Sequence, residues 1–164
     1  MISRQQHFRS YLTFRLEQIA TSARSLADEI YRTQCGLDLR HVRILRLIAE
    51  AEGKTVNQVV VESRLERSLV SRIISELVDQ GLIVRAISPI DARQFLVSVT
   101  PDGLERVEAA NEIGDLIECD LRSTLTEREL QVFEQCLEKL VRWVPCADIQ
   151  KRVETSEVIN GKSK

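Results

Sequence analysis

Hydroxyl and guanidinium side chains share one side of a helix predicted over residues 65–80. With 3.6 residues per turn, four of them recur at i, i+3, i+4 and i+7, namely Ser68, Ser71, Arg72 and Ser75, and Arg67 lies at the edge of that side. An arginine can donate two parallel hydrogen bonds to O6 and N7 of guanine, and small side chains let a helix approach a groove closely. The pattern fits a helix that reads the major groove of duplex DNA. A solvated amphipathic helix also carries mixed charges, so the helix alone does not decide between the two.

Two β-rich runs follow this helix, over residues 82–87 and 94–99. The segment between them contains the proline and aspartate typical of a turn, so the runs predict a β-hairpin. Arg85 lies before the turn and Arg93 closes it. A lone arginine at a hairpin tip can enter a narrow minor groove, and we expect Asp91 to accept hydrogen bonds from an arginine and fix its orientation. The alternative is a surface turn with an incidental Asp–Arg pair.

A short helix is expected to hold the reading helix in place. Thr55 is suited to cap it, and its apolar positions are Val56, Val59 and Val60. The valines at 59–61 would also suit a strand, but the cap favours a helix. The inner side of the reading helix is an apolar stripe, which consists of Leu65, Leu69, Val70, Ile73, Leu77 and Val78. Two helices and a hairpin in succession predict a winged helix, whose second helix fits the major groove and whose hairpin reaches the minor groove.

Regular apolar spacing marks long helices on both sides of this unit. Over residues 4–33 the spacing is 4, 3, 4, 3 and 4, at Leu12, Leu16, Ile19, Ala23, Leu26 and Ile30. Helices are also expected over 101–122 and 126–144, and the second has a similar seam, at Leu130, Phe133, Leu137, Leu140 and Val144. Such apolar seams more often pack inside one chain. Because the first helix stands outside the winged unit, we expect its seam to pack against a helix of a partner chain.

The expected fold is mainly α with a small β-hairpin: a winged helix-turn-helix, dimerised through long N- and C-terminal helices. Its parts are an N-terminal dimerisation helix (1–36), the winged helix-turn-helix (37–100), C-terminal dimerisation helices (101–146) and a tail predicted to be disordered (147–164). The winged unit would open with a helix over 37–51, with Val42, Leu45, Ile48 and Ala49 inward and Arg40, Arg43 and Arg46 on the opposite side.

Charge is distributed unevenly along a chain whose net charge is only −2. Residues 1–46 carry eight arginines against four acids, whereas residues 101–150 carry five bases against twelve acids. Salt screens the electrostatic effect of each charged patch beyond about 8–10 Å. An acidic half that faces away from DNA would therefore not prevent DNA binding. The predicted reading segment, 62–93, is neutral, with five arginines against five acids. The positions of the arginines therefore matter more than their number.

The sequence contains no motif for catalysis, a metal or a cofactor. We find no acid/base pair, no nucleophile with a histidine, no glycine loop for phosphates, and no CxxC among the four cysteines. An enzyme is therefore not expected. No apolar run approaches the roughly 20 residues of a membrane span, and the charged N-terminus does not suit export, so we expect a cytoplasmic protein. Its thiols would then be reduced; a redox sensor at Cys35, beside Gly36, is the alternative.

Residues 37–144 resemble the MarR family of bacterial transcription regulators. The wing sequence S-P-I-D-A-R-Q-F-L-V-S-V-T-P-D-G is similar to the family pattern of D-x-R, a strand and T-x-x-G, and L-V-S-R-I-I-S-E-L-V-D-Q-G-L-I is similar to its recognition helix and first wing strand. The resemblance implies a homodimer on a pseudo-palindromic operator of double-stranded DNA. By position, it assigns the major-groove contacts to Arg67, Ser68, Ser71 and Arg72, and the wing contacts to Asp91 and Arg93, flanked by Arg85 and Gln94.

Three features depart from the family pattern or leave it open. Glu66 stands where a Ser, Thr or Asp cap is expected, and glutamate caps a helix poorly. Many members bind a small phenolic or other aromatic effector, for which no motif stands out here. Some members sense peroxides through a cysteine near the start of the first helix, where this chain has none.

The function expected is that of a dimeric transcriptional regulator that binds DNA sequence-specifically, as a repressor that a small molecule can relieve. Two alternatives remain open. One is a winged-helix module that binds protein and not specific DNA. The other is a regulator that responds to thiol oxidation.

Overall fold

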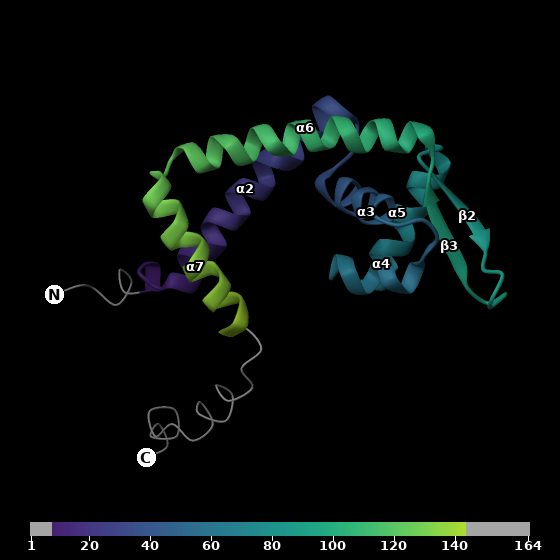
Figure 1. The fold of residues 1–164 in the computed structure, drawn as a ribbon, viewed down its shortest axis with the longest axis horizontal. Helices are drawn as coiled ribbons and strands as arrows, with labels where there is room; N and C mark the ends of the chain where they lie inside the picture. The colour runs from purple at the N-terminus through teal and green to yellow at the C-terminus, as the bar shows by residue number, and fades with distance from the viewer. Residues whose placement is uncertain (1–7, 144–164) are drawn as a thin grey trace, which may run out of the picture. The chain divides into compact units, whose positions relative to one another are not determined.

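The computed structural model describes residues 8–143, and Figure 1 shows the order of its elements. The helices are α2 (Leu12–Cys35), α3 (Leu39–Ala49), α4 (Val56–Ser63), α5 (Arg67–Asp79), α6 (Pro101–Ser123) and α7 (Glu127–Trp143). The strands are β1 (Lys54–Thr55), β2 (Ile83–Ile87) and β3 (Phe95–Val99). The chain divides into two compact units, residues 1–118 and 119–164. The mainly helical fold with a small hairpin, expected from the sequence, is confirmed.

A three-stranded antiparallel sheet forms in the order β1-β3-β2. The predicted hairpin is its main part, with a register that runs from Ile83 opposite Val99 to Ile87 opposite Phe95. Strand β1 was not predicted from the sequence. This strand has only two residues, and it exists because Lys54 lies opposite Val97 and not because of any local preference.

The core of the first unit lies where α3, α4 and α5 pack against the sheet (Figure 1). The predicted inner stripe of α5 is largely confirmed: Val70, Ile73 and Leu77 are buried. Ile74 is fully buried as well, although the sequence analysis left it out. The remaining stripe residues pack against the rim of the core and are partly exposed, namely Leu65, Leu69 and Val78.

Local signals fix the ends of these helices. Gly36 ends α2 in the left-handed conformation, with φ of 66°, which a residue without a Cβ adopts at little cost. Asp38 caps α3 by accepting hydrogen bonds from the backbone N–H groups of Arg40 and His41, so this helix begins two residues later than predicted. Thr55 and Gln58 form a capping box at α4, which confirms the short helix that was favoured over a strand.

One helix face was predicted wrongly. Arg46 was expected on the solvent side of α3 with Arg40 and Arg43, but it is partly buried. Its guanidinium group donates to the carbonyl oxygen of Ala110 on α6 and lies over the ring of Tyr31 on α2, 5.7 Å from the centroid. The periodicity of a single helix cannot reveal that two other helices pass over its outer side.

The predicted seams of the long helices are exposed within the chain. On α2, the seam residues Leu12, Ile19 and Leu26 are each more than half exposed. On α7, which opens with the predicted capping box of Thr126 and Glu129, none of the residues is buried. Residues 4–7 of the first predicted helix, Val144 and the tail predicted to be disordered at 147–164 lie outside the described residues.

Candidate nucleic-acid interface

Helix α5 presents its polar side to solvent, as the sequence predicts. Arg67, Ser68, Ser71 and Arg72 are all exposed. The helix starts at Arg67, and Glu66 occupies the cap position without a side-chain hydrogen bond, as expected for a glutamate there. The first-turn N–H groups of α5 are therefore not capped by that side chain, and the first turn contains no acidic residue.

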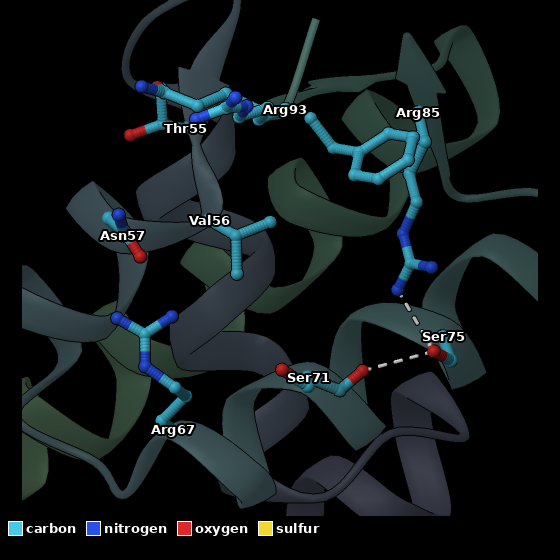
Figure 2. Close-up of a pocket in the computed structure, with 10 residues that line it drawn as sticks. Thr55, Val56, Asn57, Arg67, Ser71, Ser75, Arg85 and Arg93 are labelled. Carbon is cyan, nitrogen blue, oxygen red and sulfur yellow. Dashed lines mark hydrogen bonds between the residues drawn. The ribbon is translucent and has the colours of Figure 1, made fainter. Parts of the chain in front are cut away.

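The wing is tied directly to this helix. The guanidinium group of Arg85, on β2, donates a hydrogen bond of 2.9 Å to Oγ of Ser75 on α5, and Ser75 in turn donates to the carbonyl oxygen of Ser71. Figure 2 shows the Arg85 side chain reaching Ser75, which is bonded in turn to Ser71. This side-chain contact joins the wing to the reading helix.

A hollow of about 330 Å³ opens between α5, the start of α4 and the wing (Figure 2). Five predicted site residues meet there: Arg67, Ser71, Arg85, Arg93 and Gln94. The remaining lining residues are Thr55, Val56, Asn57, Ser75 and Phe95. Three of the ten are arginines and none is acidic, so the hollow is positively charged although the whole reading segment is neutral.

The turn of the wing is built around Asp91. Its carboxylate accepts hydrogen bonds from the backbone N–H of Arg93 at 3.0 Å and from the side-chain amide of Gln94 at 2.9 Å. The expectation that Asp91 would orient an arginine through its guanidinium group is therefore wrong. An aspartate in a turn finds the nearest backbone N–H groups first, so Asp91 shapes the turn and leaves the Arg93 guanidinium group without that restraint.

The other predicted site residues stand outside the hollow. Ser68 and Arg72 lie on α5 beyond its rim, and Asp91 belongs to the turn. The Arg72 side chain is 68% exposed, and its Nε lies 3.7 Å from a carboxylate oxygen of Glu76, one turn along the helix. That pair is loose and exposed, so the guanidinium group remains available to a ligand.

Sequence reasoning missed several lining residues, above all Asn57 near the start of α4. Nothing in the local sequence marks Asn57, because it reaches the site only when α4 packs beside α5. Ser75 did carry a signal, since it continues the spacing of Ser68 and Ser71, but its role as the partner of Arg85 depends on the position of the wing.

The structure also bears on the alternatives. Burial raises the pKa of the Cys35 thiol, although the charges of Arg106 and Arg46 partly oppose this, so the reactive thiolate is disfavoured there. Among residues 8–143, no three side chains of the metal-binding types gather in a group that could hold an ion. In the same range, no helix combines the length and apolar character that crossing a bilayer requires.

Comparison with known proteins gives the same picture. Residues 36–94 match the model of the MarR family. An HTH-type transcriptional regulator of Mycobacterium tuberculosis is 28% identical over 108 residues, which cover 66% of this chain and 76% of the relative. The S. aureus MepR–DNA complex superposes with a TM-score of 0.74 at 23% identity, over 80% of this chain and 97% of MepR.

A third protein with a similar fold was solved with a ligand bound. CouR from Rhodococcus jostii RHA1, solved with p-coumaroyl-CoA, superposes with a TM-score of 0.68 at 21% identity, over 80% of this chain and 92% of CouR. At such identities the solved structures establish the fold alone. The matched segment, 36–94, contains α3 to the wing turn and with it nearly all of the cationic hollow. Over residues 36–94 this chain matches the MarR family, and the proteins it resembles include HTH-type transcriptional regulators.

Proposed function

We propose that this chain regulates transcription as a homodimer that binds a pseudo-palindromic DNA operator, most simply as a repressor. One observation carries the proposal: Arg67, Arg85 and Arg93 converge from a helix and a wing on a hollow without acidic lining. Duplex DNA carries one negative charge per roughly 1.7 Å of its axis, which suits such a surface. One related protein is an HTH-type transcriptional regulator, and MepR, which has a similar fold, was solved on DNA.

The polar side of α5 suits the major groove. Ser68 and Ser71 are short and exposed, so the helix backbone can come close to the base edges. Arg72 lies one turn after Ser68 on the same side and can donate two hydrogen bonds to a guanine. The wing arginine Arg93, which the turn leaves free of Asp91, would enter the neighbouring minor groove, where a narrow groove concentrates negative potential.

Two copies are needed to read a palindrome, and the exposed seams support a dimer. Ile19 and Leu26 on α2, and Phe133 and Leu137 on α7, are between 37% and 61% exposed in the single chain. Apolar residues at such regular spacing are expected to be covered by another helix. The dimer would place its two α5 helices about 34–36 Å apart, one turn of DNA.

A second hollow, of about 460 Å³, offers a place for a small aromatic or phenolic effector. It lies between α2 and α3, and Arg24, Arg40 and Arg43 are among its lining residues. Its two acids are already engaged, since Asp28 accepts from the Leu39 N–H and Asp38 caps α3. An anionic aromatic compound would find the guanidinium groups of Arg40 and Arg43 there, and its binding would change the spacing of the two reading helices.

Competition binding tests the function. Affinity for a DNA site selected from random sequence is compared with that for a scrambled duplex at one stated salt concentration, because affinity depends steeply on salt. Arg72→Ala is expected to lose about 1–3 kcal/mol on the selected site, and little on the scrambled one. Equal affinity for the two duplexes in the unsubstituted protein would favour the protein-interaction module instead.

The effector is tested separately. Hydroxylated benzoates are titrated into the protein–DNA complex, with Arg43→Ala as the variant that alters the second hollow. Release of DNA that Arg43→Ala weakens would support the site. Release that this variant leaves unchanged would place the effector elsewhere.

A further inference from the structure

His41 joins the scaffold of the winged helix to its reading helix through two short contacts. On α3, its Nδ1 lies 2.8 Å from a carboxylate oxygen of Asp38. Across the interface, its Nε2 lies 2.7 Å from Oε2 of Glu76 on α5. The His41 side chain is only 14% exposed, whereas that of Glu76 is 44% exposed. A nearly buried imidazole therefore holds a carboxylate at the edge of the DNA-facing side.

Glu76 divides its two oxygens between two partners. Oε2 accepts from His41, and Oε1 lies 3.7 Å from Nε of Arg72. The first distance is that of a hydrogen bond, and the second is too long for one. Arg72 precedes Glu76 by four residues, so the two side chains are neighbours on the helix surface and could pair closely. The hydrogen bond to His41 is what keeps one oxygen of Glu76 turned toward α3.

We infer that His41 is a positioning residue for DNA reading: by holding Glu76, it prevents that carboxylate from capturing the Arg72 guanidinium group. The inference rests on the proposed function, because it assumes that Arg72 contacts bases. The contact with the imidazole occupies Oε2 of Glu76 and holds that oxygen toward α3. The guanidinium group of Arg72 is then free to donate to a base.

The size of the effect follows from the exposure of the Arg72–Glu76 pair. Exposed ion pairs shift an equilibrium by about fivefold at most, the equivalent of roughly 1 kcal/mol. His41→Ala should therefore lower affinity for a selected DNA site by about three- to fivefold. Affinity for scrambled DNA, which does not need the base contact, should change by less than about twofold.

A double-mutant cycle separates this role from a structural one. Glu76→Gln removes the charge that would capture Arg72, so adding Glu76→Gln to His41→Ala should restore site preference to within about twofold of Glu76→Gln alone. Thermal melting of each variant shows whether it is folded, and His41→Gln, which retains one amide donor toward Glu76, should lie between the unsubstituted protein and His41→Ala. Loss of preference in the double variant equal to that in His41→Ala would overturn the inference.

A measurement on the free protein, without DNA, distinguishes failure of this inference from failure of the proposed function. In the free protein, hydrogen exchange at Nε–H of Arg72, followed by NMR, should slow in His41→Ala because the arginine becomes paired. It should return to the original rate in the double variant. Unchanged exchange in His41→Ala would refute the inference whatever the protein binds. Slower exchange together with equal affinity for all DNA would support the inferred contact and refute the proposed function.

Discussion

Gly103 lies where α6 leaves the wing, and replacing it with alanine tests how closely these two elements are packed. A Cβ at this position would lie 2.0 Å from the carbonyl oxygen of Leu82 and 2.6 Å from Cγ2 of Val99. The Leu82 carbonyl cannot easily withdraw, because it accepts a hydrogen bond of 3.0 Å from the N–H of Thr100. The glycine of the T-x-x-G pattern is thus required by space.

The expected magnitude combines two opposing effects. Overpacking against backbone costs up to about 3 kcal/mol, and alanine in place of glycine within a helix returns about 1 kcal/mol. Gly103→Ala should therefore lower the free energy of unfolding by about 2 kcal/mol. For a chain of this length, a melting temperature lower by about 4–8 °C is expected.

Gly114→Ala is the matched control on the same helix. A Cβ there would meet the end of the Arg46 side chain at 2.9 Å and the Tyr31 hydroxyl at 3.2 Å, so its neighbours are side chains and not backbone. We expect a change in melting temperature less than half of that for Gly103→Ala, measured by circular dichroism at one protein concentration. A Gly103→Ala protein that melts at or above the temperature of the unsubstituted protein would refute the close approach of Leu82 and α6.

Three further predictions concern the wing, the α3 cap and the dimer. Arg93→Ala should weaken binding to selected and scrambled DNA alike and lower the salt dependence by about one phosphate equivalent; a loss confined to the selected site would contradict its place in the wing. Burial disfavours ionisation of Asp38, but hydrogen bonds and charge from His41 outweigh it and hold the pKa of Asp38 below its ordinary value. The stability that Asp38 contributes is therefore present above its unfolded pKa of about 3.9 and is lost as pH falls through its lower folded pKa. In urea unfolding measured across this pH range, Asp38→Asn should lose less stability on acidification than the unsubstituted protein. Equal losses in the two proteins would refute the role of Asp38. Ile19→Glu, at a residue that is 61% exposed in the single chain, should dissociate the dimer in sedimentation experiments while Gln18→Glu does not; unchanged sedimentation would refute a dimer through α2.

Local signals in the sequence were sufficient for most element boundaries. Gly36 and the capping boxes at Thr55 and Thr126 act within a few residues of the chain, so their effects can be predicted without the fold. The polar side of α5 was predictable for the same reason, because helical spacing determines which side chains share a face. The structure confirms the exposure of these side chains, and their contacts with DNA stay a prediction.

Features that depend on packing could not be predicted from spacing. Arg46 follows the pattern of an exposed arginine and packs against Tyr31 and Ala110 only because α2 and α6 cross α3. Strand β1 forms through pairing with β3, and Asn57 reaches the hollow through the packing of α4. No local pattern in the sequence marks His41, because its link to Glu76 joins residues 35 positions apart.

The central claim is that the hollow between α5 and the wing recognises DNA. It is tested most directly by selection from a random duplex library with the unsubstituted protein and with a variant in which Arg67, Arg85 and Arg93 are all alanine. Replacing Arg9, Arg15 and Arg142 instead removes the same charge elsewhere. The account predicts that the unsubstituted protein and this control enrich an inverted repeat with half-sites about 10–10.5 base pairs apart, and that the hollow variant enriches nothing. Equal enrichment by the hollow variant, or none by the unsubstituted protein, would contradict it.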